Sequence, residues 1–459
     1  MTERFLNLVV PLAHEATDMR IADTSQQCLD WSGAVSPLIG ASLRQDDVDS
    51  TNGRSTPTTP VTPGIRTSTT ATRTTTTRLF KAVPAPSADQ ALRHHADFSF
   101  TELVEAYYCC RQNKRNTASA LAFEQSLEPN LRALYDDLVD GSYRPGTSIC
   151  FPVTRPKVRE VWAADFRDRI VHHLLHNKIA PRFYASFIAD SCACIPGRGT
   201  LYAAQRLESK IRSITQNWTK PAYYLKLDLA NFFVAIDKTV VRDLLARRVT
   251  EPWWMALAET ILFHDPRLDF ELRGDASILA KVPPHKRLLN QPAHLGLPIG
   301  NHSSQFLANV FLDALDQFAK HVLQAKHYIR YVDDFLFLHE SAQWLNEVLA
   351  KVIEFLETVL HARLNPTKTI LQRIDRGVDF VGQVIKPHCR ATRRRTVRAA
   401  VSRITELDGE DVYTSANSYF GLLRQATSSH ADRATFAKAV LRRGHCVNQA
   451  LTKTYRIST

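Results

Sequence analysis

Tyr224-Leu-Lys-Leu-Asp228 and Tyr331-Val-Asp-Asp-Phe335 are the two segments of this 459-residue chain that decide its fold. The first segment alternates in polarity, which predicts a strand over residues 222–229 that carries a carboxylate at its end. Residues 328–339 are apolar on both sides of Asp333 and Asp334, which predicts two strands joined by a tight turn that displays both carboxylates.

A third segment runs from Gly296-Leu-Pro-Ile-Gly300 to Gln305. Its glycines and proline followed by polar residues predict a loop that continues into a helix. Such a loop is a weak signal alone, and an Asp-Asp pair at a hairpin is also ordinary turn chemistry. The order of all three segments on one basic chain is a specific combination.

Asp228 and Asp333 are expected on adjacent strands, where they would hold two divalent ions about 4 Å apart. Mg²⁺ prefers hard oxygen ligands and keeps water and phosphate in its shell. Two such ions lower the pKa of an attacking hydroxyl and stabilise a leaving pyrophosphate, which is the chemistry of nucleotidyl transfer.

Composition and charge fit this interpretation. Hydrophobic residues make up 44% of the chain and charged residues 23%, which excludes wholesale disorder, and the length suggests two to four structural units. The 58 Lys and Arg against 46 Asp and Glu give a net charge of +12, which favours a polyanionic partner. Arginines at residues 390–398 and 442–443 favour nucleic acid over a membrane. We expect a soluble chain, because no apolar run is long enough to span a bilayer.

Residues 1–95 differ from the rest of the chain. Residues 51–78 contain thirteen Thr, four Arg and no acidic residue, which predicts a disordered segment. A basic tether that touches RNA, a passive tail and an upstream start codon are the alternatives, and they stay open.

From residue 98 the pattern is that of a folded chain. Helical periodicity covers residues 98–138, with Gly141 as a stop, and residues 148–163 read as strands. Further helices are expected at 166–178, 238–248 and 344–362, a strand pair or edge at 378–386, and a basic helical end from Arg398.

The three segments together resemble those of reverse transcriptases, with Asp228 in motif A, residues 296–305 in motif B and residues 331–334 as motif C. Leu364-Asn-Pro-Thr-Lys368 is similar to motif D, and residues 378–382 are similar to the primer grip. Residues 156–159 and 166–173 look like the fingers segments of bacterial reverse transcriptases.

The resemblance covers about residues 98–430 and implies an α+β fold of the right-hand polymerase type. That fold has fingers, a palm with an antiparallel sheet and a helical thumb. The implied division is an extension at 1–95, fingers with N-terminal helices at 96–220, a palm at 221–388 and a basic helical thumb at 389–459.

Roles follow from the resemblance position by position. It implies Asp228, Asp333 and Asp334 as catalytic carboxylates and metal ligands, with the carbonyl of Leu229 as a further ligand. Lys368 matches a general acid for the pyrophosphate, and its alternative is a solvated loop lysine.

The resemblance also implies a site for the incoming nucleotide. Arg159 falls where a fingers arginine grips the triphosphate, a role that suits a forked donor. Phe233 matches the steric gate that would exclude a ribose 2′-OH; its alternative is a core Phe, and Phe232 is the expected core partner. The expected nucleotide-binding residues are Arg159, Leu229, Phe233, Ile299, Gly300 and Gln305.

Motif B indicates which reverse transcriptase the chain resembles. Ile299 stands where many members have Gln, and Ser304-Gln305 replaces Ser-Pro. This form looks like that of diversity-generating retroelement enzymes, as do residues 190–194, 197–200 and 417–424. Those enzymes copy an RNA template and misincorporate opposite adenine. A Gln amide can hydrogen-bond near the nascent pair whereas Ile can only pack, so we hypothesise that Ile299 relaxes discrimination.

Two departures keep alternatives open. The family core lacks the long N-terminal extension, and Ala235 stands where Ser is usual. A phage-defence reverse transcriptase is the alternative within the class. An RNA-binding scaffold without catalysis is the alternative outside it, although three carboxylates facing a polyanion argue against that.

The resemblance implies Mg²⁺ as the cofactor, two ions, with Mn²⁺ as a substitute. It implies an RNA template, a nucleic-acid primer and dNTPs as partners, with a small basic accessory protein and no membrane. The expected location is the bacterial cytoplasm.

Overall fold

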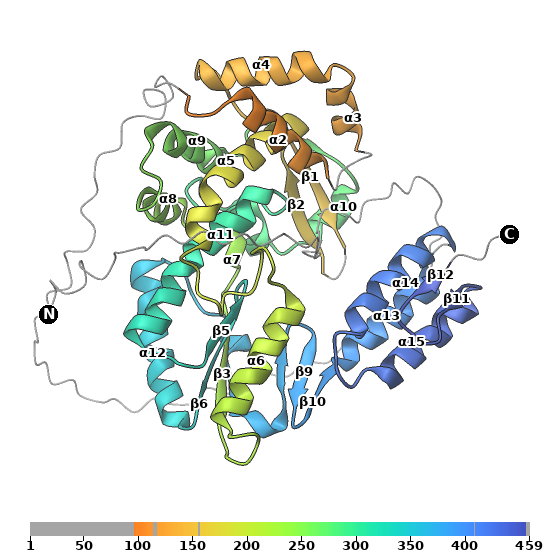
Figure 1. Ribbon diagram of the computed structural model, residues 1–459. Coiled ribbons are helices and arrows are strands. Elements are labelled where there is room, and N and C mark those ends of the chain that lie inside the picture. Colours follow the sequence, from red (N-terminus) through yellow and green to blue (C-terminus); the bar gives the residue numbers. More distant parts are fainter. Residues whose placement is uncertain (1–95, 113–116, 155–156, 408, 456–459) are drawn as a thin grey trace, which may run out of the picture. The chain divides into compact units, whose positions relative to one another are not determined.

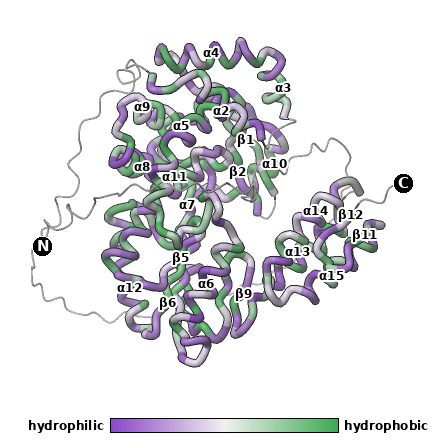
Figure 2. Tube along the Cα trace, in the orientation of Figure 1, coloured by the Kyte–Doolittle hydropathy of each residue, from purple (hydrophilic) through white to green (hydrophobic). Residues whose placement is uncertain are grey.

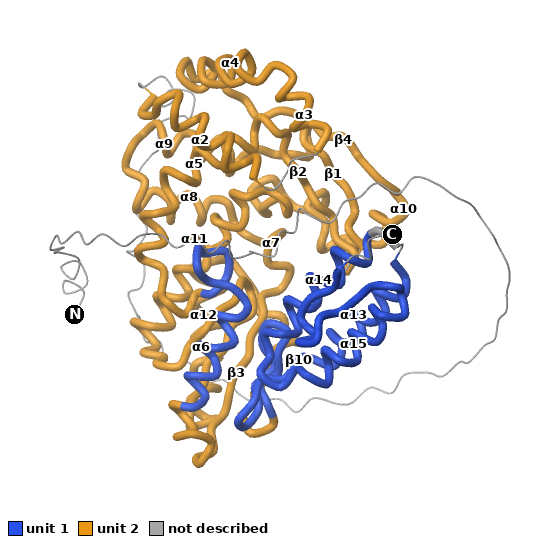
Figure 3. The backbone as a smooth tube through the Cα atoms, turned by 45° about the vertical axis from the view of Figure 1, so that its right-hand side comes forward, with its two compact units in different colours: residues 1–30, 192–212, 377–459 blue, residues 31–191, 213–376 orange. Residues whose placement is uncertain are grey.

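The computed structural model describes residues 96–112, 117–154, 157–407 and 409–455. The Thr-rich extension at 1–95 and Pro156 of the predicted fingers segment lie outside the described residues. The described chain forms two compact units, which are coloured in Figure 3. Unit 1 contains described residues from 192–212 and 377–455, and unit 2 contains those from 96–191 and 213–376.

Three helices open unit 2 where one helical stretch was expected. They are α2 (Phe100–Arg111), α3 (Ala118–Glu124) and α4 (Leu127–Val139). Ser99 and Glu102 form a capping box that begins α2. Gly141, at φ 77°, follows α4, so the predicted stop is confirmed.

The strands expected over residues 148–163 are confirmed as an antiparallel pair. They are β1 (Ser148–Val153) and β2 (Arg159–Ala163), and β4 (Phe270–Leu272) adds to β1 in parallel. Helix α5 (Phe166–Tyr184) follows, and the side chain of Asp165 caps it by accepting a hydrogen bond from Arg167 N. This helix runs six residues past its expected end because Pro181 is accommodated inside it.

A four-stranded antiparallel sheet forms the base of the candidate site (Figure 1). Its order is β5 (Tyr328–Tyr331), β6 (Asp334–His339), β3 (Tyr223–Asp228) and β7 (Ile370–Arg373). Helix α12 (Ala342–Val359) packs on β3 and β6. Residues 335–338 of β6 form a continuous apolar run that is buried. Figure 2 shows both apolar and polar residues along α12, as expected for an amphipathic helix that buries one face.

The remaining elements of unit 2 connect these parts. The expected helix at 238–248 is confirmed as α8, and the loop at 296–301 runs into α11 as expected. The helices are α7 (Phe232–Ala235), α8 (Lys238–Ala246), α9 (Pro252–Phe263), α10 (Ala276–Ala280) and α11 (His302–Gln317), with a π-helical turn at η3 (Phe318–Val322). Four short 3₁₀ turns lie at Pro284–Lys286, Leu288–Asn290, Pro366–Lys368 and Ile374–Arg376.

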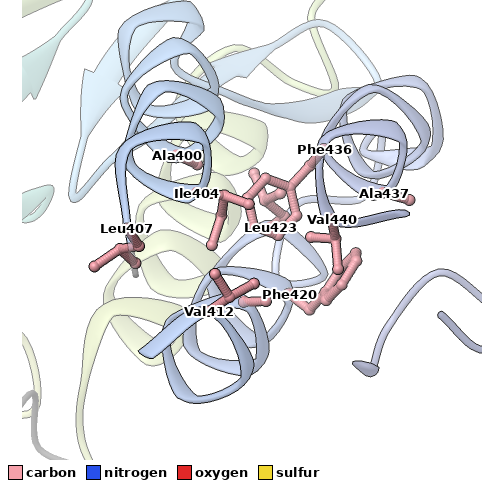
Figure 4. Packing of buried hydrophobic residues seen from close by; sticks show 10 residues of the cluster. Ala400, Ile404, Leu407, Val412, Phe420, Leu423, Phe436, Ala437 and Val440 are labelled. Carbon is pink, nitrogen blue, oxygen red and sulfur yellow. The ribbon is translucent and has the colours of Figure 1, made fainter. Parts of the chain in front are cut away.

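Unit 1 combines a small sheet with a helical bundle. The expected strand pair is confirmed as β8 (Val378–Phe380) and β9 (Gln383–Lys386), and β10 (Cys389–Thr392) extends it. Helices α13 (Arg394–Glu406), α14 (Gly409–Leu423) and α15 (His430–Arg442) follow, then a two-stranded ribbon of β11 (Cys446–Val447) and β12 (Thr454–Tyr455). Figure 4 shows side chains of the three helices, among them Ile404, Phe420 and Phe436, packed into one core.

Unit 1 also contains most of α6 (Thr200–Ile214). The contact pattern therefore groups residues 192–212, expected in the fingers, and residues 377–388, expected in the palm, with the C-terminal helices. The division into fingers, palm and thumb stays a prediction. Across the described residues, no helix combines the length and apolarity needed to cross a bilayer.

Candidate active site

Strand β3 carries the first carboxylate to the edge of the site. Leu225 and Leu227 are fully buried, and the alternation places Lys226 and Asp228 on the opposite face. Asp228 is the last residue of the strand and lies opposite Asp334 of β6. The predicted strand and the position of its carboxylate are therefore confirmed.

The second pair of carboxylates comes from the β5–β6 hairpin. Tyr331 pairs with Asp334, so that Val332 and Asp333 form a two-residue turn. The predicted hairpin is confirmed, with Asp334 as the first residue of β6 and Asp333 in the turn. Because Asp228 and Asp334 are opposite each other, all three carboxylates lie at one end of the sheet.

Electrostatics show which groups surround Asp333. Its pKa is raised above its usual value by burial and by the neighbouring Asp228 carboxylate, whereas the positive charges of Lys368 and Arg159 act to lower it. The charge of Asp333 is therefore influenced by three residues from other parts of the chain, at the start of β2, the end of β3 and the turn before β7.

Two lysines neutralise two of the carboxylates. Lys368 Nζ donates to Asp228 Oδ2 at 2.6 Å, and Lys226 Nζ lies 2.8 Å from Asp334 Oδ2. Burial raises the pKa of Asp334 to about 6, although Lys226 opposes this rise. Lys368 was expected near the site. Lys226 was not, although its position two residues before Asp228 places it on the same face of the strand.

The carboxylates fit a divalent-ion site. Asp334 Oδ1 is buried and has no hydrogen-bond partner among the described residues, as expected for an oxygen that would bind a cation or accept a hydrogen bond from water. Within the described residues, no group of three or more His, Cys, Asp or Glu side chains is arranged to hold a metal ion by itself. That agrees with Mg²⁺, which binds through one or two carboxylates and completes its shell with water and phosphate oxygens.

The carbonyl of Leu229 remains a predicted ligand. Leu229 forms an isolated bridge with Leu364. The two hydrogen bonds that flank this bridge run from Asn365 N to Asp228 O and from Ala230 N to Arg363 O. The bridge therefore does not use the Leu229 carbonyl.

The loop before α11 is hydrogen-bonded to β2 and to the residue that follows it, Ala164. Trp162 N donates to Ile299 O at 2.7 Å, and Ala164 N donates to Asn301 Oδ1 at 2.9 Å. Gly300 has a φ of 129°, and a Cβ there would come within 2.5 Å of Trp162 O and 2.8 Å of Val161 Cγ1. Only glycine lets the loop approach β2 this closely, and β2 begins with Arg159. Gln305 follows in the first turn of α11, half-buried.

We expect Gly300→Ala to displace this loop from β2. The added Cβ would overlap the backbone of Trp162, and overpacking of this kind costs about 1–3 kcal/mol of unfolding free energy. Chemical denaturation of the variant would measure the loss. Gly199→Ala is the matched control, because a Cβ at Gly199 meets no atom within 4 Å. Equal stability of the two variants would contradict the conclusion that the close approach of the loop to β2 requires glycine at position 300.

The two phenylalanines of α7 lie in different environments. Phe232 is buried and its ring lies 6.3 Å from that of Phe311, so its prediction as the core partner is confirmed. Phe233 is only half-buried. Its carbonyl accepts a hydrogen bond from Leu297 N at 2.7 Å, which connects α7 to the loop before α11.

The arginine-rich stretch at 390–398 divides into two kinds of residue. Arg390 is almost fully buried and lies 3.0 Å from Glu208, and Arg393 pairs with Asp379. These two arginines therefore support the fold of unit 1. The three arginines of the stretch that lie on α13, namely Arg394, Arg395 and Arg398, are exposed.

Comparison with known proteins gives one informative match. No curated protein matches the chain. Among solved structures, the chain is similar to telomerase from Candida albicans in complex with a TWJ fragment of telomeric RNA, at 13% identity and a TM-score of 0.40, over 65% of this chain and 56% of that one. It is also similar to apo telomerase from Candida tropicalis, at 14% identity and a TM-score of 0.40, over 65% and 57%. The chain thus spans just over half the length of these telomerase chains.

Residues 154–385, half of the chain, match the sequence profile of the reverse transcriptase (RNA-dependent DNA polymerase) family. The match contains both carboxylate segments, the loop before α11 and the four-stranded sheet. Together with the antiparallel sheet and its helices, it confirms the expected α+β polymerase fold. The chain belongs to the reverse transcriptase family.

Proposed function

We propose that the chain is an RNA-directed DNA polymerase that extends a nucleic-acid primer along an RNA template by two-metal nucleotidyl transfer. The observation that carries the proposal is the gathering of Asp228, Asp333 and Asp334 at one end of the sheet. Lys368 and Arg159 lie beside them. Carboxylates and a triphosphate-binding cation at one site are what this chemistry needs.

Asp228 and Asp333 are the carboxylates that would hold two Mg²⁺ ions. When bound, these ions supply a lowered pKa for the primer hydroxyl and charge stabilisation for the pyrophosphate. Lys368 donates a proton to the leaving pyrophosphate. Its side chain is 49% exposed, so the ammonium can leave its ion pair with Asp228 and bind a phosphate oxygen without disturbing core packing.

Arg159 and the loop before α11 bind the nucleotide. Support for the role of Arg159 comes from its charge, which acts to lower the pKa of Asp333, and from its forked guanidinium, which suits a triphosphate. Ile299, whose carbonyl accepts a hydrogen bond from Trp162 N of β2, lines the nascent pair together with Gly300. Gln305, in the first turn of α11, completes this part of the proposed nucleotide site.

Primer extension tests the proposal. A defined RNA template with a DNA primer, dNTPs and Mg²⁺ should give full-length product, and Asp333→Asn should not. Product from the RNA template that does not depend on Asp333 would contradict the assigned site. Binding of the template without any product, even with Mn²⁺ and alternative primers, would favour an RNA-binding scaffold.

Phe233 is proposed as the gate that excludes ribonucleotides. In Phe233→Val the smaller side chain should admit the 2′-OH, and incorporation of rNTPs relative to dNTPs should rise roughly 10- to 100-fold. Steady-state kinetics with each nucleotide would measure the ratio. Phe232→Val is the control, because that ring packs in the core and should alter stability rather than sugar selectivity. An unchanged ratio in Phe233→Val would remove the gate assignment.

We further propose that the enzyme is error-prone at template adenines, as in a diversity-generating retroelement. The support is the half-buried side chain of Ile299, which can pack but cannot hydrogen-bond. Ile299→Gln should lower misincorporation opposite adenine about three- to tenfold, the effect of roughly one hydrogen bond. Sequencing of the products measures this, with Ile299→Leu as the control. Accurate product from the unaltered chain would favour the phage-defence type instead.

A further inference from the structure

The turn that carries Asp333 has an unfavourable backbone. Val332 is at φ 54°, whereas Asp333 is not in the positive-φ region. A two-residue hairpin turn with positive φ only at its first position follows the type II′ pattern, where glycine is preferred. Valine is β-branched, so its presence here is strained. Such conformations persist at functional sites only where surrounding contacts fix them.

Arg330 supplies those contacts. Its guanidinium donates from Nη1 to Val332 O at 3.1 Å and to Asn309 Oδ1 at 3.2 Å. It also donates from Nε and Nη2 to the two oxygens of Asp316, at 2.8 and 2.6 Å, and from Nη2 to Ser191 Oγ at 2.8 Å. The Arg330 side chain therefore joins the turn both to α11, through Asn309 and Asp316, and to Ser191.

The anchor of this network, the Arg330–Asp316 pair, is fully buried. Arg330 and Asp316 both have 0% exposed side chains, and Tyr328 also donates to Asp316 Oδ1, at 2.7 Å. Burial alone would lower the pKa of Arg330, but Asp316 holds it above its usual value. A bidentate pair of this kind fixes direction as well as distance, which a lysine cannot reproduce.

We propose that Arg330 is a positioning residue that holds the strained Val332 turn and thereby sets the position of the Asp333 carboxylate. Arg330 is fully buried, so it acts through the turn. The inference rests on the proposed function for its catalytic consequence, since that function gives Asp333 its role. Its structural part, the restraint of the turn, stands independently.

Arg330→Lys tests the catalytic consequence. In primer extension the variant should lose about 100-fold in kcat, the scale of a misplaced reacting group. The KM for dNTP should change little, since Arg330 does not face the nucleotide. Val332→Gly in the same chain should recover much of the kcat, because glycine adopts positive φ without strain. The fall in Tm caused by Arg330→Lys should persist in the double variant.

Tyr328→Phe is the matched control. It removes a hydrogen bond to the same Asp316 but none to the turn, so it should lower Tm and leave kcat unchanged. Equal losses of kcat in Tyr328→Phe and Arg330→Lys at equal Tm would make Arg330 a stabiliser of the fold only. Failure of Val332→Gly to recover kcat would also overturn the proposal.

Two measurements do not depend on polymerase activity. Amide hydrogen exchange of a peptide spanning residues 331–335 should quicken in Arg330→Lys but not in Tyr328→Phe. Should Arg330→Lys fail to fold, Val332→Gly alone should raise Tm by relieving strain, and an unchanged or lower Tm would overturn the inference. An inactive wild-type chain that still shows the exchange difference would refute the proposed function and retain the restraint.

Discussion

Asp333→Asn is expected to reduce dNTP incorporation by about 10²- to 10³-fold or more, since it removes a charge that acts on the reacting groups. The substitution keeps the size of the side chain and removes the carboxylate that lies beside Asp228. The substitution also removes the electrostatic repulsion between two neighbouring carboxylates at a buried site. The variant should therefore be at least as stable as the wild type. Primer extension and thermal unfolding on the same preparation would measure both effects.

The control is Asp375→Asn. Asp375 is an exposed aspartate of the same unit that pairs with Arg373 at the surface, so its loss should leave incorporation unchanged. Template RNA affinity should be the same in both variants, because Asp333 contributes no positive charge to phosphate binding. Full activity in Asp333→Asn would contradict the assignment of the site. A parallel fall in RNA affinity would show that the substitution acts on template binding.

The sequence predicted those parts of the fold that depend on short-range patterns. The two-residue period of β3 and the apolar run around Asp333 both identify their strands, because each signal lies within a single segment. Residues 98–138 were expected as one helical stretch, and the structure instead divides them among three helices. The two-residue strands β11 and β12 were missed, since pairs that short carry no periodic signal.

The residues of the candidate site also divide into those with a local sequence signal and those without one. Asp228, Asp333 and Lys368 could be predicted because each lies in a motif with a recognisable local form. Lys226 and Arg330 could not, because their importance depends on which residues lie across from them in space. The grouping of residues 192–212 with the C-terminal helices is a long-range contact of this kind.

Lys226→Met should lower the unfolding free energy by about 1–3 kcal/mol, because it leaves the partly buried Asp334 carboxylate without its cation. Methionine keeps most of the length of the lysine stem, so little packing is lost. Urea denaturation without divalent ions would measure the change. Lys351→Met on the exposed face of α12 is the control and should have no comparable effect.

A second substitution and an added ion distinguish charge from packing. Asp334→Asn in the Lys226→Met chain should restore most of the lost stability, since no unpaired charge then remains. Mg²⁺ should raise the Tm of Lys226→Met more than that of the wild type, because a bound cation can replace the missing ammonium beside Asp334. If Asp334→Asn gives no recovery and Mg²⁺ stabilises both chains equally, Lys226 acts by packing alone. Lys226 would then have no part in balancing the charge of the carboxylates.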